Sequence, residues 1–512
     1  MGQYRRMMSS FVEVEPGMDK PPMELKQKAL KGIIWSGAQT WGGRAVSFIV
    51  FVVLSRLLTP EAFGLVAMAS LFITFIQTFQ DQGFGDAIIQ RSDLQQEHLD
   101  TAFWTNLLTG VLLTLVSIIC SGLIATLFHQ PQLVPIIRWL SLSFILAGLS
   151  STQQAILRRQ LAFKELTLRS VSAIFVGGVI GVVLAFLGFG VWSLVTQTLI
   201  NGLVGIMVLW RVSHWRPSFH FSKKHFHDLF TFGVNIIGMN ILNFFNRHAD
   251  DLLIGYFLGP TLLGFYTIAY KLFGTMTELL TSVTNAVAFP TFSRLQNDSE
   301  RMHRAFYQAV HYTSLIAFPA FIGMAVVAPE LIPTLFGPQW TISIPVLRVL
   351  AFIGILLSIF YFHNSLVIAI GKPSWRLGMI FLNAITNVIA FAIAVRWGII
   401  AVAAAYVIRG YLISPIEFWM VRKLAKIDLG FYFHQFIGPL AGSLAMTAVI
   451  LGLEYLWTDA LSIQLQLAIY VITGSIIYLL TVRLLEPSLW PGIKNLLRLV
   501  LPARYFPRIQ GS

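Results

Sequence analysis

The chain has 512 residues, of which 56% are hydrophobic and 12% charged, and its formal net charge is +13. Because a soluble domain carries about 25% charged residues, this composition excludes an ordinary soluble protein. The single cysteine, Cys120, excludes an intrachain disulfide. The basic residues lie mostly between apolar runs, which is typical of membrane topology and not of nucleic-acid binding.

Apolar runs recur along the chain after a polar N-terminal segment that contains Pro16, Pro21 and Pro22. Each run approaches the roughly 20 residues that a helix needs to cross a bilayer. The runs are too long for barrel strands, and backbone in lipid must satisfy its own hydrogen bonds. We therefore predict an all-α integral membrane protein with about fourteen transmembrane helices, at 31–54, 64–88, 103–128, 134–157, 168–187, 190–211, 228–254, 262–289, 306–328, 345–370, 375–396, 399–421, 433–456 and 464–486.

Lysine and arginine residues fall mainly on one side of these spans. With the N-terminus inside, the inside segments hold 28 of the 36 basic residues, and the outside loops hold only Arg56 and Arg396. This asymmetry predicts that both termini face the cytoplasm. Asp86 and Arg91, at the inner end of the second span, are interpreted as residues that order the adjoining loop.

The sequence contains an internal repeat. Segment 58–64 (LTPEAFG) matches 258–264 (LGPTLLG), 135–140 matches 345–350, and 190–194 matches 398–402, at offsets of 200, 210 and 208. Three matches in order predict two copies of a six-helix bundle. Because six is even, the copies share an orientation and are related by an axis along the membrane normal.

The repeat divides the chain into predicted units: an N-terminal tail over 1–27, an N-lobe over 28–212, a cytoplasmic linker over 213–227, a C-lobe over 228–424, an appended helix pair over 433–486 and a basic C-terminal tail over 487–512.

Polar residues form stripes on four predicted helices, the first two of each lobe. Steps of three and four place them on one face of each helix, and a charge in the bilayer costs about 2.5–3.5 kcal/mol on insertion scales. We therefore predict that the stripes share a water-accessible cavity between the lobes. The stripes are Ser36, Thr40, Arg44 and Ser47; Thr74, Thr78 and Asp81; Asn240, Asn243, Arg247 and Asp250; and Lys271, Thr275, Glu278, Ser282 and Asn285.

Two groups of candidate site residues follow. The candidates for substrate binding are Arg44, Arg247, Arg409, Lys271 and Asn243, and those for cation coupling are Asp81, Glu278 and Asp250. Alternatives stay open. The stripes could be hydrogen-bonding contacts within a lobe, Arg44 could pair with a buried carboxylate, Lys271 and Glu278 could neutralise each other, and Asp250 could lie at a solvated helix end. Arg138 and Arg348 are interpreted as residues that reach the interface.

Signatures of catalysis and of cofactor binding are missing from the sequence. No histidine has partners at metal-ligand spacing, and there is no phosphate loop or nucleotide fingerprint. We expect no enzyme activity, no metal and no cofactor.

Several segments resemble the Wzx-type polysaccharide flippases, in the colanic-acid and teichuronic-acid exporter branch of the multidrug/oligosaccharidyl-lipid/polysaccharide superfamily. They are 249–272 (ADDLLIGYFLGPTLLGFYTIAYKL), 289–295 (FPTFSRL), 55–64 (SRLLTPEAFG) and 81–90 (DQGFGDAIIQ). The resemblance covers roughly residues 28–430, and the appended pair fits only by pattern.

The resemblance implies two lobes in a V, alternating access, and an undecaprenyl-pyrophosphate-linked oligosaccharide as the substrate for surface polysaccharide biosynthesis at the inner membrane. It implies membrane lipids, a polysaccharide polymerase and chain-length machinery as partners, and no nucleic acid. Related flippases use cationic cavity residues, a role that it carries to Arg44 and, less directly, to Arg247.

Two other functions are weighed against this one. A cation-coupled multidrug antiporter of the same superfamily would use a small acid-lined pocket, against which six basic residues inside predicted spans argue. A polysaccharide polymerase or ligase would present catalytic groups on a large outer loop. Here the longest outer loop, 329–344, has Glu330 as its only ionisable residue.

Overall fold

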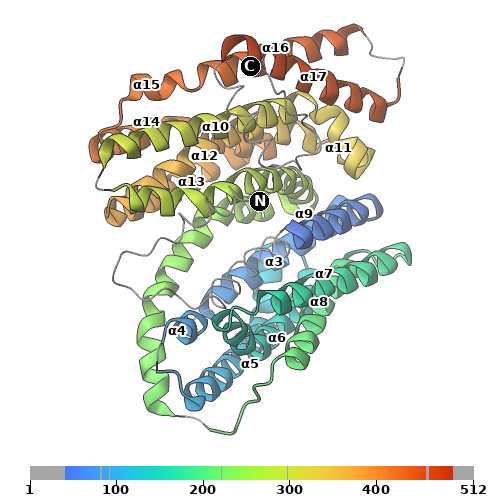
Figure 1. Ribbon diagram of the computed structural model, residues 1–512. Helices are drawn as coiled ribbons and strands as arrows, with labels where there is room; N and C mark the ends of the chain where they lie inside the picture. The colour runs from blue at the N-terminus through green and yellow to red at the C-terminus, as the bar shows by residue number, and fades with distance from the viewer. Residues whose placement is uncertain are drawn as a thin grey trace, which may run out of the picture.

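The computed structural model describes residues 41–80, 83–91, 93–220, 222–296, 298–456 and 461–487. Within these ranges every regular element is a helix, which confirms the predicted all-α class. Figure 1 shows two helical groups, coloured blue to green and yellow to red, with α9 continuing from the first into the second.

The N-lobe contains a helical segment at 41–57, followed by α3 (Pro60–Gln80), α4 (Phe84–Gln90), α5 (Gln96–Leu127), α6 (Leu133–Arg159), α7 (Phe163–Phe186) and α8 (Val191–Val212). The C-lobe contains α9 (Lys223–Arg294), α10 (Ser299–Val326), α11 (Ala328–Phe336), η1 (Pro338–Trp340), α12 (Ser343–Ala369), α13 (Pro373–Ala394), η2 (Val395–Trp397) and α14 (Ile399–Ala425). The appended pair consists of α16 (Ile437–Leu456) and α17 (Ile463–Leu485), preceded by the short α15 (Leu429–His434).

Twelve helices in the described ranges are long and apolar enough to cross a membrane. The predicted count of fourteen stays a prediction, for two reasons. The first predicted span, 31–54, lies only partly within the described residues, and the predicted spans 228–254 and 262–289 both fall in α9, which counts as one candidate over Asn240–Thr281.

α9 is interrupted where the two predicted spans meet. Gly259 has φ 85° and ψ 178°, so the helix is not continuous at this residue. Glycine adopts this positive φ without steric cost, and the following Pro260 has no N–H with which to bond the preceding turn. We refer to residues 223–258 and 260–294 as the first and second arms of α9.

The first part of the predicted linker is attached to the N-lobe. Residues 213–220 are not helical, and α9 begins at Lys223, before the predicted end of the linker at residue 227. The Asp100 carboxylate on α5 accepts hydrogen bonds from the backbone N–H and the hydroxyl of Ser218, the first at 3.0 Å. Trp104 donates to the Ser218 carbonyl at 2.8 Å and stacks on Phe219. Residues 213–220 therefore pack with the N-lobe and do not hang free between the lobes.

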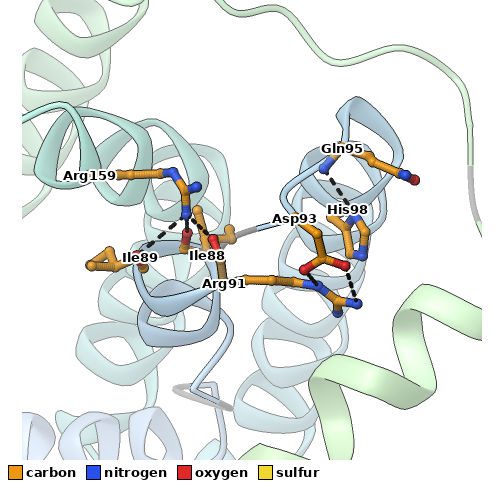
Figure 2. Close-up of polar contacts among 7 residues, drawn as sticks. All are labelled: Ile88, Ile89, Arg91, Asp93, Gln95, His98 and Arg159. Carbon is orange, nitrogen blue, oxygen red and sulfur yellow. Dashed lines mark hydrogen bonds and ion pairs between the residues drawn. The ribbon is translucent and has the colours of Figure 1, made fainter.

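Arginines order the connection between α4 and α5, shown in Figure 2. Arg159 at the end of α6 donates to the carbonyls of Ile88 and Arg91, the first at 2.7 Å. Arg91 donates to Asp93 at 2.8 Å and lowers the pKa of that carboxyl below its usual value. These contacts agree with the interpretation of Arg91 as a loop-ordering residue.

Replacing Arg159 with methionine should lower the stability of the folded chain. The change leaves carbonyls at the end of α4 without a cationic donor, which costs about 1–3 kcal/mol and should lower the midpoint of thermal unfolding in detergent. The control is Arg158→Met, because Arg158 is exposed on the same turn. Equal midpoints for the two variants would contradict the assignment.

Candidate functional site

A cavity of about 860 Å³ lies between the two lobes and the appended pair. The N-lobe contributes the helical segment at 41–57, and the C-lobe contributes the second arm of α9 together with α10 and α11. The appended pair closes the remaining side with α16 and α17. The cavity is therefore built from all three units of the fold.

Charged groups from both lobes meet on the cavity wall. Arg44 comes from the N-lobe, and Lys271 and Glu278 come from the second arm of α9. Arg44 Nε lies 3.5 Å from Glu278 Oε2, with the side chains 38% and 63% exposed. Ion pairs this accessible are weak, typically within about 1 kcal/mol. Arg44 Nη1 is buried and has no hydrogen-bond partner among the described residues, so the guanidinium has an unused donor beside the cavity.

The rest of the wall is mostly apolar. On α16 and α17 it is formed by residues such as Met446, Ile450, Val471 and Leu479. The hydroxyl of Tyr478 donates to the Leu315 carbonyl at 2.6 Å, so this polar group already has a partner within the protein. The cavity thus has cations, Arg44 and Lys271, beside an apolar wall on α16 and α17. This arrangement suits an amphiphilic ligand with an anionic headgroup.

The structure brings together only some of the predicted site residues. Arg44, Lys271, Thr275 and Glu278 line the cavity, as the spacing of the stripes predicts, whereas Asn243 and Arg247 are not part of its wall. Asp81 and the side chains of Ser282 and Asn285 lie outside the described residues. Their assigned roles stay predictions.

Two candidates lie inside the C-lobe. Arg409 donates to Asn383 and lies 5.4 Å from the Tyr406 ring, away from the cavity wall. Asp250 is 4% exposed and accepts a hydrogen bond from Tyr266 at 2.7 Å. The alternative of a solvated helix end for Asp250 is therefore wrong, and Arg409 is a lobe-packing residue in this structure. Arg138 likewise bonds within its own lobe, to Ser121.

The contribution of α17 to the cavity was not predicted. Tyr470, Gly474 and Tyr478 all line it, at steps of four that place them on one face of the helix. That spacing is a signal that could have identified the face, although nothing in it says which neighbour the face meets.

One end of the inter-lobe space is closed by direct contact between the repeated segments. A Cβ on Gly64 would lie 1.7 Å from the Pro260 carbonyl oxygen, and a Cβ on Gly264 would lie 1.9 Å from that of Pro60. The two contacts are equivalent under the repeat offset of 200. We call this contact of Pro60, Gly64, Pro260 and Gly264 the glycine seam.

Polar contacts reinforce the glycine seam. Arg56 donates to the Leu335 carbonyl at 2.8 Å, at the end of α11. Trp340 and Gln339 both donate to the Ser55 carbonyl, at 2.8 and 3.0 Å. These bonds join the end of the helical segment at 41–57 to the α11–η1 region, so the N-lobe and the C-lobe are held together at this end.

Residues 53–345 match the model of a protein family described as "Polysaccharide biosynthesis protein". The chain is 28% identical over 464 residues to the teichuronic acid biosynthesis protein TuaB of Bacillus subtilis, covering 89% of this chain and 95% of that protein. It is 28% identical over 449 residues to the lipopolysaccharide biosynthesis protein WzxC of Escherichia coli, covering 84% and 90%. The resemblance drawn from the sequence motifs is confirmed.

A solved structure of the lipid II flippase MurJ in an inward closed conformation has the same fold. The TM-score is 0.72 at 15% identity, with 89% of this chain and 99% of that chain covered. An inward-facing multidrug transporter of the MATE family gives 0.54 at 19% identity, covering 75% and 94%. The two-lobe fold predicted from the repeat is therefore confirmed.

Proposed function

Because the chain belongs to the polysaccharide biosynthesis protein family, whose model matches more than half of it, we propose that it is a flippase for a lipid-linked oligosaccharide. The proposed substrate is an undecaprenyl-pyrophosphate-linked oligosaccharide, moved across the inner membrane for surface polysaccharide biosynthesis. The observation that carries the proposal is the meeting of Arg44 and Lys271 beside the apolar wall of an inter-lobe cavity.

The cationic end of the cavity suits a pyrophosphate. Pyrophosphate oxygens match the planar fork of an arginine, and a lysine adds a compact charge. Arg44 is held by one weak contact to Glu278, so an incoming phosphate can replace that carboxylate. Since Arg44 and Glu278 belong to different lobes, the exchange also releases an inter-lobe contact and thereby couples binding to lobe movement.

The apolar wall suits the lipid part of the substrate. The described wall residues on α10, α16 and α17 carry no charged side chain. A polyprenyl chain that leaves the bilayer to lie against them therefore stays in an apolar environment, at little cost in free energy. The headgroup can then cross between the lobes while the chain remains in an apolar environment.

We place the glycine seam on the outer side of the membrane, following the predicted cytoplasmic position of both termini. Lobes joined at Gly64 and Gly264 are then closed outside, and export requires the seam to part. An inside-negative potential favours outward movement of two negative charges by roughly 4–5 kcal/mol at 100 mV. A multidrug antiporter fits this site less well, because the described residues of the cavity wall include two cations and one carboxylate.

The direct test is transport in proteoliposomes that contain the purified chain and a fluorescent undecaprenyl-pyrophosphate oligosaccharide. We expect time-dependent accessibility of the sugar to an enzyme added on the far side of the membrane. A multidrug substrate should not be moved under the same conditions. Movement of the drug and not of the glycan would refute the proposal.

A further inference from the structure

A second apolar groove lies where the appended pair meets the C-lobe. It has a volume of about 620 Å³ and runs between α10, α12 and α14 on one side and α15 and α16 on the other. Phe352, Ile437 and Leu444 on its walls are exposed, so the groove is open to the bilayer. Its polar groups are occupied, since Tyr411 donates to the Phe352 carbonyl and Thr447 to that of Ser443. An occupant must therefore be apolar.

This groove is separate from the inter-lobe cavity. Both use α16, but Met446 and Ile450 line the cavity whereas Leu440, Leu444 and Thr447 line the groove. The two sets lie on different faces of the helix. A ligand in the groove would therefore leave the proposed substrate site free.

A cationic pocket lies at the start of α15, the same helix that lines the groove through Phe433. It has a volume of about 590 Å³ and is lined by Arg422 and Lys426 at the end of α14 and by Gly430 in α15. Gly430 and Phe433, which lines the groove, are separated by about one helical turn. The short helix α15 therefore contributes to both the charged pocket and the apolar groove.

The pocket keeps a net positive charge, because its lining holds two cations and one carboxylate. Asp428 is its one carboxylate, and it accepts hydrogen bonds from the backbone N–H groups of Gly430 and Phe431 at 2.8 and 3.4 Å. Arg422 and Lys426 are exposed and form no ion pair within the described part of the chain. They are available to an anion.

Two tryptophans indicate the depth of the pocket in the membrane. Lys423 lies between Arg422 and Lys426 in the sequence, and its Nζ is 5.3 Å from the Trp375 ring and 4.7 Å from the Trp419 ring. Tryptophan is enriched at the membrane–water interface. The cationic pocket therefore lies at headgroup level, with the groove extending into the hydrocarbon.

We propose that this junction is a binding site for an anionic phospholipid. The phosphate contacts Arg422 and Lys426, and one acyl chain fills the groove between α14 and α16. Basic pockets between transmembrane helices on the cytoplasmic side bind anionic headgroups in this way. The lipid joins the appended pair to the C-lobe, and its binding does not depend on what the chain transports.

The test measures thermal unfolding of the full-length protein in detergent during titration with dioleoyl-phosphatidylglycerol or with phosphatidylcholine of the same chains. We expect phosphatidylglycerol to raise the midpoint at lower concentration. The double variant Arg422→Gln and Lys426→Gln should need roughly thirty-fold more phosphatidylglycerol for half the effect. The matched control is Arg301→Gln with Arg304→Gln, which removes two exposed cations at the start of α10.

A second variant tests the groove separately from the charge. Leu444→Trp fills the groove and should reduce the response to phosphatidylglycerol while leaving both cations in place. Native mass spectrometry of the wild-type protein should show retained phosphatidylglycerol even if a variant folds poorly. Equal responses to the two lipids, an unchanged response in both variants, or the same midpoint shift with inorganic phosphate alone would each overturn the proposal.

Discussion

Replacing Arg44 with alanine is expected to abolish transport of the lipid-linked oligosaccharide without loss of folded protein. Arg44 is the cation that the described part of the N-lobe presents to the cavity, and its buried Nη1 has no hydrogen-bond partner among the described residues. Hydrogen bonds to charged groups contribute about 1.5–3 kcal/mol each. Loss of a two-bond phosphate contact should therefore reduce transport at limiting substrate by about a hundred-fold or more.

The effect of Arg44→Ala on the stability of the fold should be small, so loss of transport can be told apart from loss of folded protein. The pair of Arg44 with Glu278 is accessible to solvent on both sides, and such pairs contribute little to folding. Arg44→Lys should recover part of the transport, because it keeps the charge but not the planar fork.

The matched control is Arg138→Ala. Arg138 lies in a predicted span as Arg44 does, but it bonds to Ser121 within the N-lobe and does not line the cavity. Its removal should leave transport near the wild-type rate. Wild-type transport by Arg44→Ala, measured in the same proteoliposomes, would eliminate Arg44 as a substrate ligand.

Glu278→Gln distinguishes a displaceable partner from a coupling group. If the carboxylate only competes with phosphate for Arg44, the variant should keep its maximal rate and reach half-saturation at a lower substrate concentration. If Glu278 instead carries a coupled cation, the maximal rate should fall and its dependence on pH should change. The concentration dependence of transport at two pH values separates these outcomes.

Much of this architecture could be predicted because the bilayer imposes strict rules on sequence. Long uncharged runs must be helices in lipid, and spacing by three and four places Lys271, Thr275 and Glu278 on one face, where the structure has them on the cavity wall. Spacing does not say which neighbour a polar residue meets. Arg409 therefore had the same sequence signature as Arg44, yet it contacts Asn383 inside the C-lobe.

Long-range contacts were the part that local patterns could not provide. The position of α17 beside the cavity depends on the path of the chain through α15 and α16. These helices lie outside the internal repeat, so no equivalent segment of the N-lobe indicates that path. The match of 58–64 with 258–264 indicated two related segments, but not that they touch. Only the structure shows that each glycine packs against the proline of the other copy.

Replacing Gly264 with leucine should prevent the glycine seam from closing, which in the proposed topology opens the outer side. The Cβ would lie 1.9 Å from the Pro60 carbonyl oxygen, whereas non-bonded atoms are normally about 3.5–4.0 Å apart. The backbones at the seam must then separate by more than about 1 Å, which also disturbs the bonds from Arg56 and Trp340. We expect a population of molecules open to the outside and a large loss of transport.

Accessibility of the cavity measures this opening. In a Cys120→Ala background, which removes the only native thiol, Ser47→Cys places a single thiol on the cavity wall. A membrane-impermeant maleimide added to intact cells should label it slowly in the parent and rapidly with Gly264→Leu, with an intermediate rate for Gly264→Ala. Gly122→Leu is the control, because a Cβ there meets no atom within 4 Å. If Gly264→Leu is labelled at the parent rate, as the control should be, the glycine seam is not the barrier of the proposed topology, because separation of the lobes at this point would expose Ser47 to the reagent.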